Sequence, residues 1–187
     1  MTTELTVYAE DAIATATLAS SHPRLADLLT SYDPITTVGA VVRALEGSRR
    51  MHFGTLELLR REILIAVPDG MRGDLGRRLC TLTYPAVARI GPFEVTGKLH
   101  SPPSTDAFAV AKRRNWVALT DATVSWMANG RRQVAAHPTI LLNGSHLGQL
   151  QPAGPDGMAS RTIAAGSAWG HPIGWAFAPV AGRSAAG

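Results

Sequence analysis

The sequence predicts a mainly β protein: two tandem small β-barrels, each with one short helix, followed by a Gly/Ala/Pro-rich C-terminal tail. Three observations favour this fold class. Short runs rich in Val, Ile and Thr are bounded by turn residues, the order of these runs recurs roughly 80 positions later, and the composition changes after Pro152. A chain of 187 residues has room for two units of about 60 to 80 residues each, which is the size that a small β-barrel needs.

The first repeat begins with two short strands on either side of Glu10 and Asp11, where apolar and smaller residues alternate. Pro23 suits the first turn of a helix, and Leu25, Leu28 and Leu29 give that helix one apolar stripe. Further strands are expected over the segments 35–45, 51–59 and 63–67.

A turn-rich stretch with Gly70, Gly73 and Gly76 marks the boundary between the repeats. We therefore expect a first repeat at 1–70, a connecting segment at 71–90, a second repeat at 91–152 and a low-complexity tail at 153–187. Within the connecting segment, 79–90 alternates loosely and is compatible with a strand that joins the two repeats.

The second repeat opens with an alternating strand at 93–99 and a helix at 105–112, for which Ser104 is the expected cap. A strand at 116–127 then leads to Asn129-Gly130, a strong hairpin signal because both turn residues need positive φ. Asn143-Gly144 predicts a second hairpin of the same kind.

The strand between these turns, 134–142, should pair with both of its chain neighbours, with Pro138 placed at an edge or a bulge. The two repeats then align with a nearly constant offset of 81 to 83 positions. Gly47 matches Gly130, Arg49-Arg50 matches Arg131-Arg132, and 59–67 matches 142–150. We interpret this as an internal duplication.

The segments HPRLADLLTS in the first repeat and GKLHSPP and WVALTDA in the second resemble a family of short uncharacterised bacterial proteins. Members of that family have the character of small Sm-like or SH3-like β-barrels. The resemblance implies a fold for each repeat, and it supplies no catalytic residue.

The composition restricts the cellular setting. Cys80 is the single cysteine, so an intrachain disulfide is excluded and a reducing compartment is compatible. No apolar run approaches the roughly 20 residues of a membrane span, and the N-terminus lacks the pattern of a signal peptide. We expect a cytoplasmic protein without a membrane span.

No motif for an enzyme stands out. The chain has no Gly-x-Ser-x-Gly nucleophile elbow and no phosphate-binding loop, and its six histidines are spread singly without a cysteine pattern. His100, His137 and His146 all fall in the second repeat and could meet in space. We predict no catalytic residue, no bound metal and no cofactor.

Two binding functions are alternatives. Paired arginines at predicted turns, with a nearby tryptophan for base stacking, suggest binding of RNA or DNA through Arg113, Arg114, Arg131, Arg132 and Trp116. The run NGSHLG fits half of the pattern of PilZ barrels, which bind cyclic dinucleotides, and makes Asn143, Ser145 and Gly148 candidate ligand-binding residues. The arginine half of that pattern is missing.

The function that we favour from the sequence is a non-catalytic scaffold that forms a homo-oligomer or joins a larger complex. Open barrel edges need a partner strand, and symmetric self-association is a common way to supply one. The tail contains large apolar side chains that are costly to leave in water, and these are the candidate docking residues Trp169, Ile173, Trp175 and Phe177.

Overall fold

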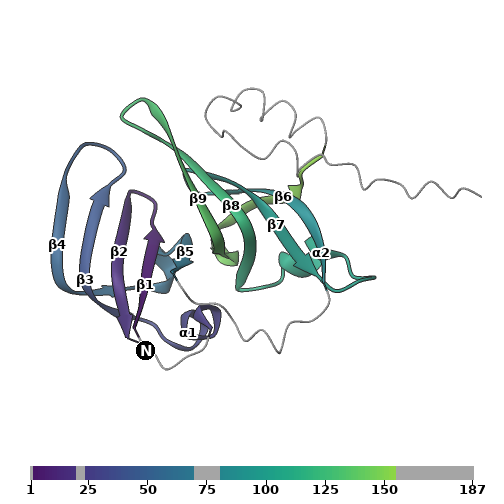
Figure 1. The fold of residues 1–187 in the computed structure, drawn as a ribbon, viewed down its shortest axis with the longest axis horizontal. Helices are drawn as coiled ribbons and strands as arrows, with labels where there is room; N and C mark the ends of the chain where they lie inside the picture. The colour runs from purple at the N-terminus through teal and green to yellow at the C-terminus, as the bar shows by residue number, and fades with distance from the viewer. Residues whose placement is uncertain (1, 20–23, 70–80, 155–187) are drawn as a thin grey trace, which may run out of the picture.

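The structure, a computed structural model, describes residues 2–19, 24–69 and 81–154. It confirms a mainly β protein, because ten strands form one antiparallel sheet (Figure 1). The predicted tail and its four docking residues Trp169, Ile173, Trp175 and Phe177 lie outside the described residues, and so does Cys80. None of the described helices is long and apolar enough to cross a membrane.

The first half of the sheet, purple to blue in Figure 1, is built from five strands, one α-helix and one short 3-10 helix. In chain order these are β1 (Thr2–Tyr8), β2 (Ala12–Ala19), α1 (Leu25–Ser31), β3 (Ile35–Ala44), β4 (Arg50–Leu58), η1 (Arg60–Glu62) and β5 (Ile65–Pro68).

The second half, teal to yellow-green, repeats the same succession. Its elements are β6 (Leu82–Ile90), β7 (Phe93–Ser101), α2 (Ala107–Ala111), β8 (Trp116–Ala128), β9 (Arg131–Asn143), η3 (Gly144–His146) and β10 (Leu147–Pro152). Part of the predicted connecting segment, 82–90, is thus the strand β6, which pairs with β7 and with β10.

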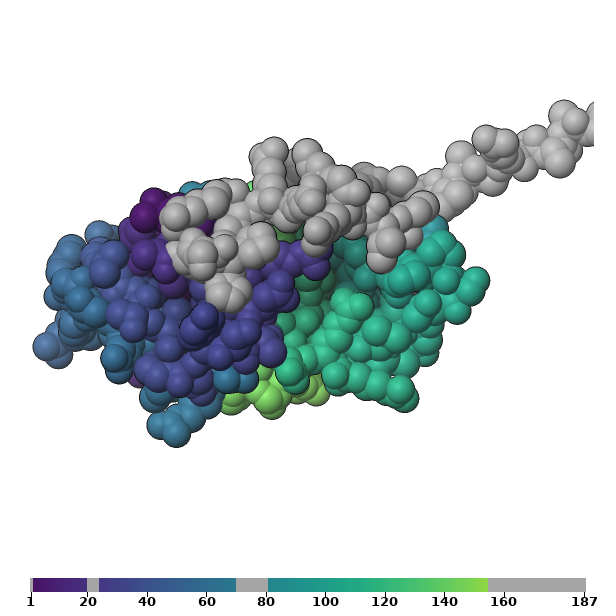
Figure 2. All heavy atoms as spheres, turned by 90° about the horizontal axis from the view of Figure 1, so that it is seen from below, coloured from purple at the N-terminus to yellow at the C-terminus, as the bar shows by residue number. Residues whose placement is uncertain are grey.

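The order of strands in the sheet also repeats. It runs β10-β6-β7-β8-β9-β5-β1-β2-β3-β4, so each half places its fifth strand beside its first strand and its fourth strand at the far side. The halves join where β9 pairs with β5. Both Figure 1 and the space-filling view of Figure 2 place them side by side along the long axis of the molecule.

The register of the pairs defines which residues of the two halves are counterparts. Val7 pairs with Ala14 as Ala88 pairs with Val95, which is a shift of 81 positions. At the end of each half the shift is 84, because Pro68 lies opposite Leu5 just as Pro152 lies opposite Ala86. The offset between counterpart residues of the two halves therefore reaches 84, one position more than the 81 to 83 expected from the sequence.

A β-bulge occurs at the same place in both halves. The pairing between β2 and β3 shifts by one residue beside Gly39, whose φ is 62°, and the pairing between β7 and β8 shifts beside Asp121, whose φ is 48°. The residues across from these two are Gly54 and Pro138, and neither is paired. Pro138 thus faces a bulge, as proline inside a sheet requires.

Two hydrophobic clusters form the core, and each is centred on one half but includes residues of the other: Trp116 and Leu141 belong to the first cluster, and Tyr8, Ile13 and Leu45 belong to the second. The first cluster gathers the buried leucines of α1 with residues of β1 to β5, including Leu5, Leu29 and Ile63. The second gathers residues of β6 to β10, including Phe93 and Leu119. The clusters meet along β5, because Ala66 belongs to the first and its neighbours Ile65 and Val67 belong to the second.

Two further expectations from the sequence are wrong. Asn143-Gly144 forms no hairpin: the chain passes through η3, and β10 then crosses to pair with β6, while β9 pairs with β8 and β5. Ser104 does not cap α2, because the carboxylate of Asp106 accepts hydrogen bonds from the amides of Phe108 and Ala109. The residue directly before the first turn of α2 is Asp106, and an aspartate at this position is a preferred N-cap.

Candidate functional site

The two ends of the sheet are open. Among the described residues, β4 pairs only with β3 and β10 pairs only with β6. A strand at an open end presents unpaired backbone donors and acceptors, so it is a ready template for a strand from another molecule. The first candidate site is therefore this pair of edges.

The junction between the halves shows how two such edges fit together inside the chain. Ile65 lies opposite Leu142 and Ala66 lies opposite Leu141 in an antiparallel pair. The backbone amide of Asn143 extends the junction by donating to the carbonyl of Leu64 at 2.9 Å.

The side chain of Asn143 reinforces this junction. Its Nδ2 donates to the carbonyls of Ile63 at 2.9 Å and Arg60 at 3.1 Å, both in the other half. Its Oδ1 accepts from the amide and the hydroxyl of Ser145. Asn143 is 3% exposed.

Of the predicted ligand-binding residues Asn143, Ser145 and Gly148, the first two are therefore engaged in hydrogen bonds within the chain. Asn143 and Ser145 bond to each other and to the backbone around η1 and η3, and Gly148 lies on β10.

A second contact joins the tips of the two long hairpins. Oδ1 of Asn129, in the turn between β8 and β9, accepts from the amide of Gly47 at 2.8 Å. The carboxylate of Glu46 accepts from the amide of Asn129 at 3.0 Å. The turn between β3 and β4 is thus fixed against the turn between β8 and β9.

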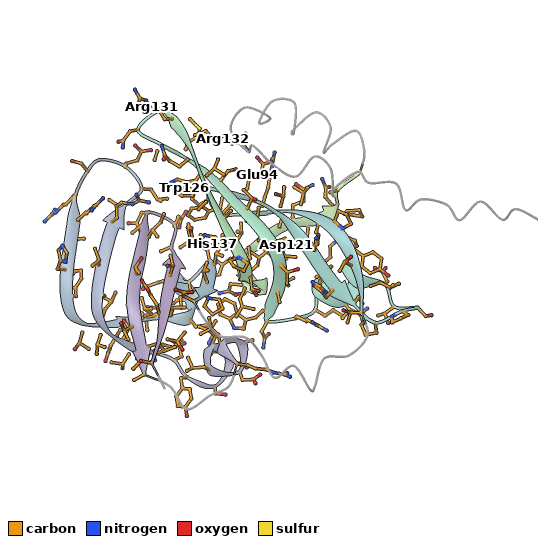
Figure 3. All side chains as sticks on the ribbon, in the orientation of Figure 1. Glu94, Asp121, Trp126, Arg131, Arg132 and His137 are labelled. Atoms are coloured by element: carbon orange, nitrogen blue, oxygen red, sulfur yellow. The ribbon has the colours of Figure 1, made fainter. Side chains whose placement is uncertain are left out.

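A cavity of about 150 Å³ lies beside this contact, and Arg43, Trp126, Asn129 and Gln133 are among the residues that line it. Figure 3 shows Arg131 and Arg132 at the adjoining hairpin tip. The guanidinium of Arg132 donates to Glu94 at 3.2 Å and to the hydroxyl of Ser125 at 3.0 Å.

The tips carry several exposed cations, namely Arg43, Arg49, Arg50, Arg131 and Arg132. An anionic ligand of some length could contact arginines of both hairpins, because the Gly47–Asn129 contact brings them together.

The arginine pairs predicted for nucleic acid do not form one patch. Arg113 and Arg114 follow α2 and precede the start of β8, whereas Arg131 pairs with Ala128 at the other end of that strand. With 13 residues in β8, the two ends are about 40 Å apart. The sequence did not show that the turn before Arg49 and Arg50 contacts the turn before Arg131 and Arg132, through Gly47 and Asn129.

Trp116 is 6% exposed and packs in the cluster of the first half, so its ring faces no solvent. Its indole nitrogen is buried without a hydrogen-bond partner. Trp126 is also buried, among residues of the second cluster. Neither tryptophan offers a stacking surface for a base in this conformation.

A partly buried polar pair connects the two halves. The hydroxyl of Tyr8 on β1 lies 2.7 Å from Nε2 of His137 on β9, and the Tyr8 ring makes edge contacts with Phe93 and Trp126. Burial raises the pKa of Tyr8 to about 12, although Arg43 opposes this effect, and burial lowers the pKa of His137.

Both shifts favour the neutral forms near pH 7. A hydrogen bond between two neutral side chains thus connects β1 of the first half to β9 of the second.

The other histidines do not join His137. His100 bonds to Thr120 through Nε2 at 2.7 Å and lies near Thr81, while His146 is in η3. Within the part of the chain that the structure describes, no three His, Cys, Asp or Glu side chains are close enough to hold a metal ion.

Comparison with known proteins adds no relative: no protein-family model matches the chain, and no match was found among curated proteins or among solved structures.

Proposed function

We propose that the protein is a non-catalytic scaffold of two tandem small β-barrel units that self-associates through the open edges of its sheet. The observation that carries this proposal is the pair of edges. The free strands β4 and β10 are the counterparts of β9 and β5, the two strands that already pair inside the chain. An uncovered edge of this kind promotes association with another strand.

The division into two units is supported by the repeated succession of elements and by the repeated order of the strands in the sheet. The single cysteine suits a cytoplasmic location, which we include in the proposal.

The experiment is size-exclusion chromatography with light scattering on the full chain and on a chain that ends at Pro152. Association through the edges predicts an oligomer in both cases, because β4 and β10 are retained. An oligomer only with the full chain would assign the association to the predicted tail residues. A mass of one chain in both cases would contradict the scaffold proposal.

A second candidate function is binding of RNA or DNA at the hairpin tips, and the specific observation that favours it is the Gly47–Asn129 contact. Through this contact Arg49 and Arg50 join Arg131 and Arg132 on one end of the molecule. Phosphate contacts from such a cluster give binding that weakens with salt.

Fluorescence anisotropy with a labelled single-stranded RNA and a labelled DNA duplex tests this candidate. Replacement of Arg49 and Arg131 with Ser should weaken binding, whereas replacement of Arg113 and Arg114, at the opposite end of β8, is the matched control for net charge. Equal loss in both variants, or no binding at low salt, would contradict it.

A further inference from the structure

We propose that β4 of one copy pairs antiparallel with β10 of a second copy, in the same register that joins β9 to β5 within the chain. The inference rests on the proposed self-association and names its partner strand and its register. The partner that binds at this surface is a second copy of this chain.

The argument begins with the equivalence of the edges. In each half the fourth strand lies farthest from the fifth, so β4 corresponds to β9 and β10 corresponds to β5. The chain itself pairs the fourth strand of the second half with the fifth strand of the first. Within the residues that the structure describes, one fourth strand and one fifth strand remain open, and these are complementary ends.

The register follows from the shift of 84 positions. Within the chain, Leu142 lies opposite Ile65 and Leu141 lies opposite Ala66. In the proposed contact, their counterparts Leu58 and Glu57 lie opposite Gln149 and Leu150 of the second copy. One of the two paired positions of the fourth strand keeps its residue type, since Leu58 replaces Leu142, whereas Glu57 replaces Leu141.

Space for the incoming strand exists beside β10. A wide depression of about 510 Å³ is lined by residues 147–151 together with Lys112 and Gly144. The counterparts of 147–151 are 63–67, and this segment includes Ile65 and Ala66, which pair with β9 in the junction. The depression therefore corresponds to the place that a fourth strand occupies inside the chain.

The strand β4 lacks two of the residue types that commonly protect an edge, although it carries the charged residues Arg50 and Glu57. It is nine residues long, its sequence is RMHFGTLEL, and it contains neither proline nor lysine. Natural edge strands commonly carry such residues because they discourage pairing. Phe53 on this strand is 37% exposed.

The contact between copies is more polar than the internal junction. Asn143 corresponds to Leu59, so the two hydrogen bonds that the Asn143 side chain donates to backbone carbonyls have no counterpart between copies. The Tyr8–His137 pair corresponds to Arg89 and Phe53, and a guanidinium on an aromatic ring is itself an attractive contact. We expect reversible association held mainly by backbone hydrogen bonds.

Such pairing is head-to-tail, because each copy contributes two different edges. Interfaces of this type close into rings when the rotation between neighbours allows it. A closed assembly then leaves no open strand, and it always contains an even number of halves.

Disulfide crosslinking between two differently labelled chains tests the register. In a full-length Cys80→Ala background, one chain carries Leu58→Cys and the other carries Gln149→Cys. The mixture should give about tenfold more crosslinked dimer than either chain alone, because a disulfide needs Cβ atoms within about 4 Å. A mixture of Thr55→Cys and Gln149→Cys is the control for register.

A variant at Glu57 tests the same pairing without a cysteine. The amide of Asn143 points into the internal junction, so by the period of two along a strand the amides of Leu141 and its counterpart Glu57 point to their edges as well. Glu57→Pro removes this donor and Glu57→Thr keeps it. We expect Glu57→Pro to raise the dissociation constant about tenfold relative to Glu57→Thr, the effect of one or two lost hydrogen bonds.

The outcomes separate the two proposals. An oligomer that crosslinks at positions 58 and 149 and is weakened by Glu57→Pro supports the inference. An oligomer that fails to crosslink there, or crosslinks equally through position 55, overturns the inference and leaves self-association intact. A monomeric parent chain overturns both.

Discussion

The hydroxyl of Tyr8 and Nε2 of His137 lie 2.7 Å apart, and this hydrogen bond connects β1 of the first half to β9 of the second. Both side chains are neutral near pH 7 because burial disfavours their charged forms. The two halves are therefore joined by more than the short β5–β9 ladder.

Removing one partner of this pair should destabilise the whole sheet. Tyr8→Phe keeps the ring contacts with Phe93 and Trp126 and deletes the hydroxyl, so we expect a loss of about 1 kcal/mol in the free energy of unfolding. Urea denaturation of Tyr8→Phe, His137→Gln and the double variant measures the coupling. Additive losses in the double variant would show that the hydrogen bond contributes nothing.

Acid should weaken the fold through His137. Its pKa is lowered in the folded protein, so below the ordinary value of 6.5 the unfolded chain binds the proton more tightly. The stability is then fully present above about pH 6.5 and declines as the pH falls toward the folded pKa.

Thermal melts between pH 5 and pH 8, roughly the range in which histidine titrates, measure this decline. The slope of Tm against pH should be smaller in His137→Gln, and His146→Gln is the control at a histidine in η3. An equal slope in all three proteins would contradict the assignment to His137.

Alkali should act through Tyr8. Burial raises the pKa of its phenol from 10.0 to about 12, so the unfolded chain loses this proton first as the pH rises. The associated stability is present below pH 10 and is lost between about pH 10 and pH 12. Denaturation of the parent and of Tyr8→Phe across this range should show a steeper decline for the parent.

Asn143 should be the most sensitive polar residue at the junction. Asn143→Leu, which introduces the residue found at the counterpart position 59, leaves the carbonyls of Arg60 and Ile63 without their donor. We expect a loss of about 2 to 3 kcal/mol, the cost of buried polar groups without partners. Ser145→Ala, which removes only one hydroxyl from the same group, should cost about 1 kcal/mol or less.

The bulge offers a test of the repeat that is independent of packing. Gly39 has a φ of 62°, and a Cβ at this position would meet no atom within 4 Å. Backbone strain alone should therefore make Gly39→Val cost about 1 to 3 kcal/mol.

Gly39→Asp should cost less, because aspartate occupies the counterpart position 121 and tolerates positive φ. Equal unfolding free energies for these two variants would contradict the backbone explanation.

Local patterns in the sequence predicted most of the elements. The alternation at 93–99 and the Val- and Thr-rich run at 35–45 became β7 and β3, and Asn129-Gly130 became the turn between β8 and β9. Pro138 was correctly placed at a bulge. These features depend on neighbouring residues, whose spacing is visible in the chain.

Long-range pairing was not predictable in the same way. Asn143-Gly144 has the composition of a hairpin turn, but Asn143 serves the junction with the other half, and the carbonyls that it binds lie about 80 positions earlier. The contact of Asn129 with Gly47 and that of Tyr8 with His137 depend on how the halves pack. No local pattern in the sequence shows which of the arginine-containing turns contact each other in the folded protein.

Hydrogen exchange at two chain concentrations tests the central claim most directly, because it reports the backbone amides of the sheet edges themselves. The account predicts that peptides from β4 and β10 exchange more slowly at the higher concentration while β8, inside the sheet, exchanges at the same rate. Unchanged exchange of β4 and β10 under conditions where the chain is an oligomer would contradict association through the edges.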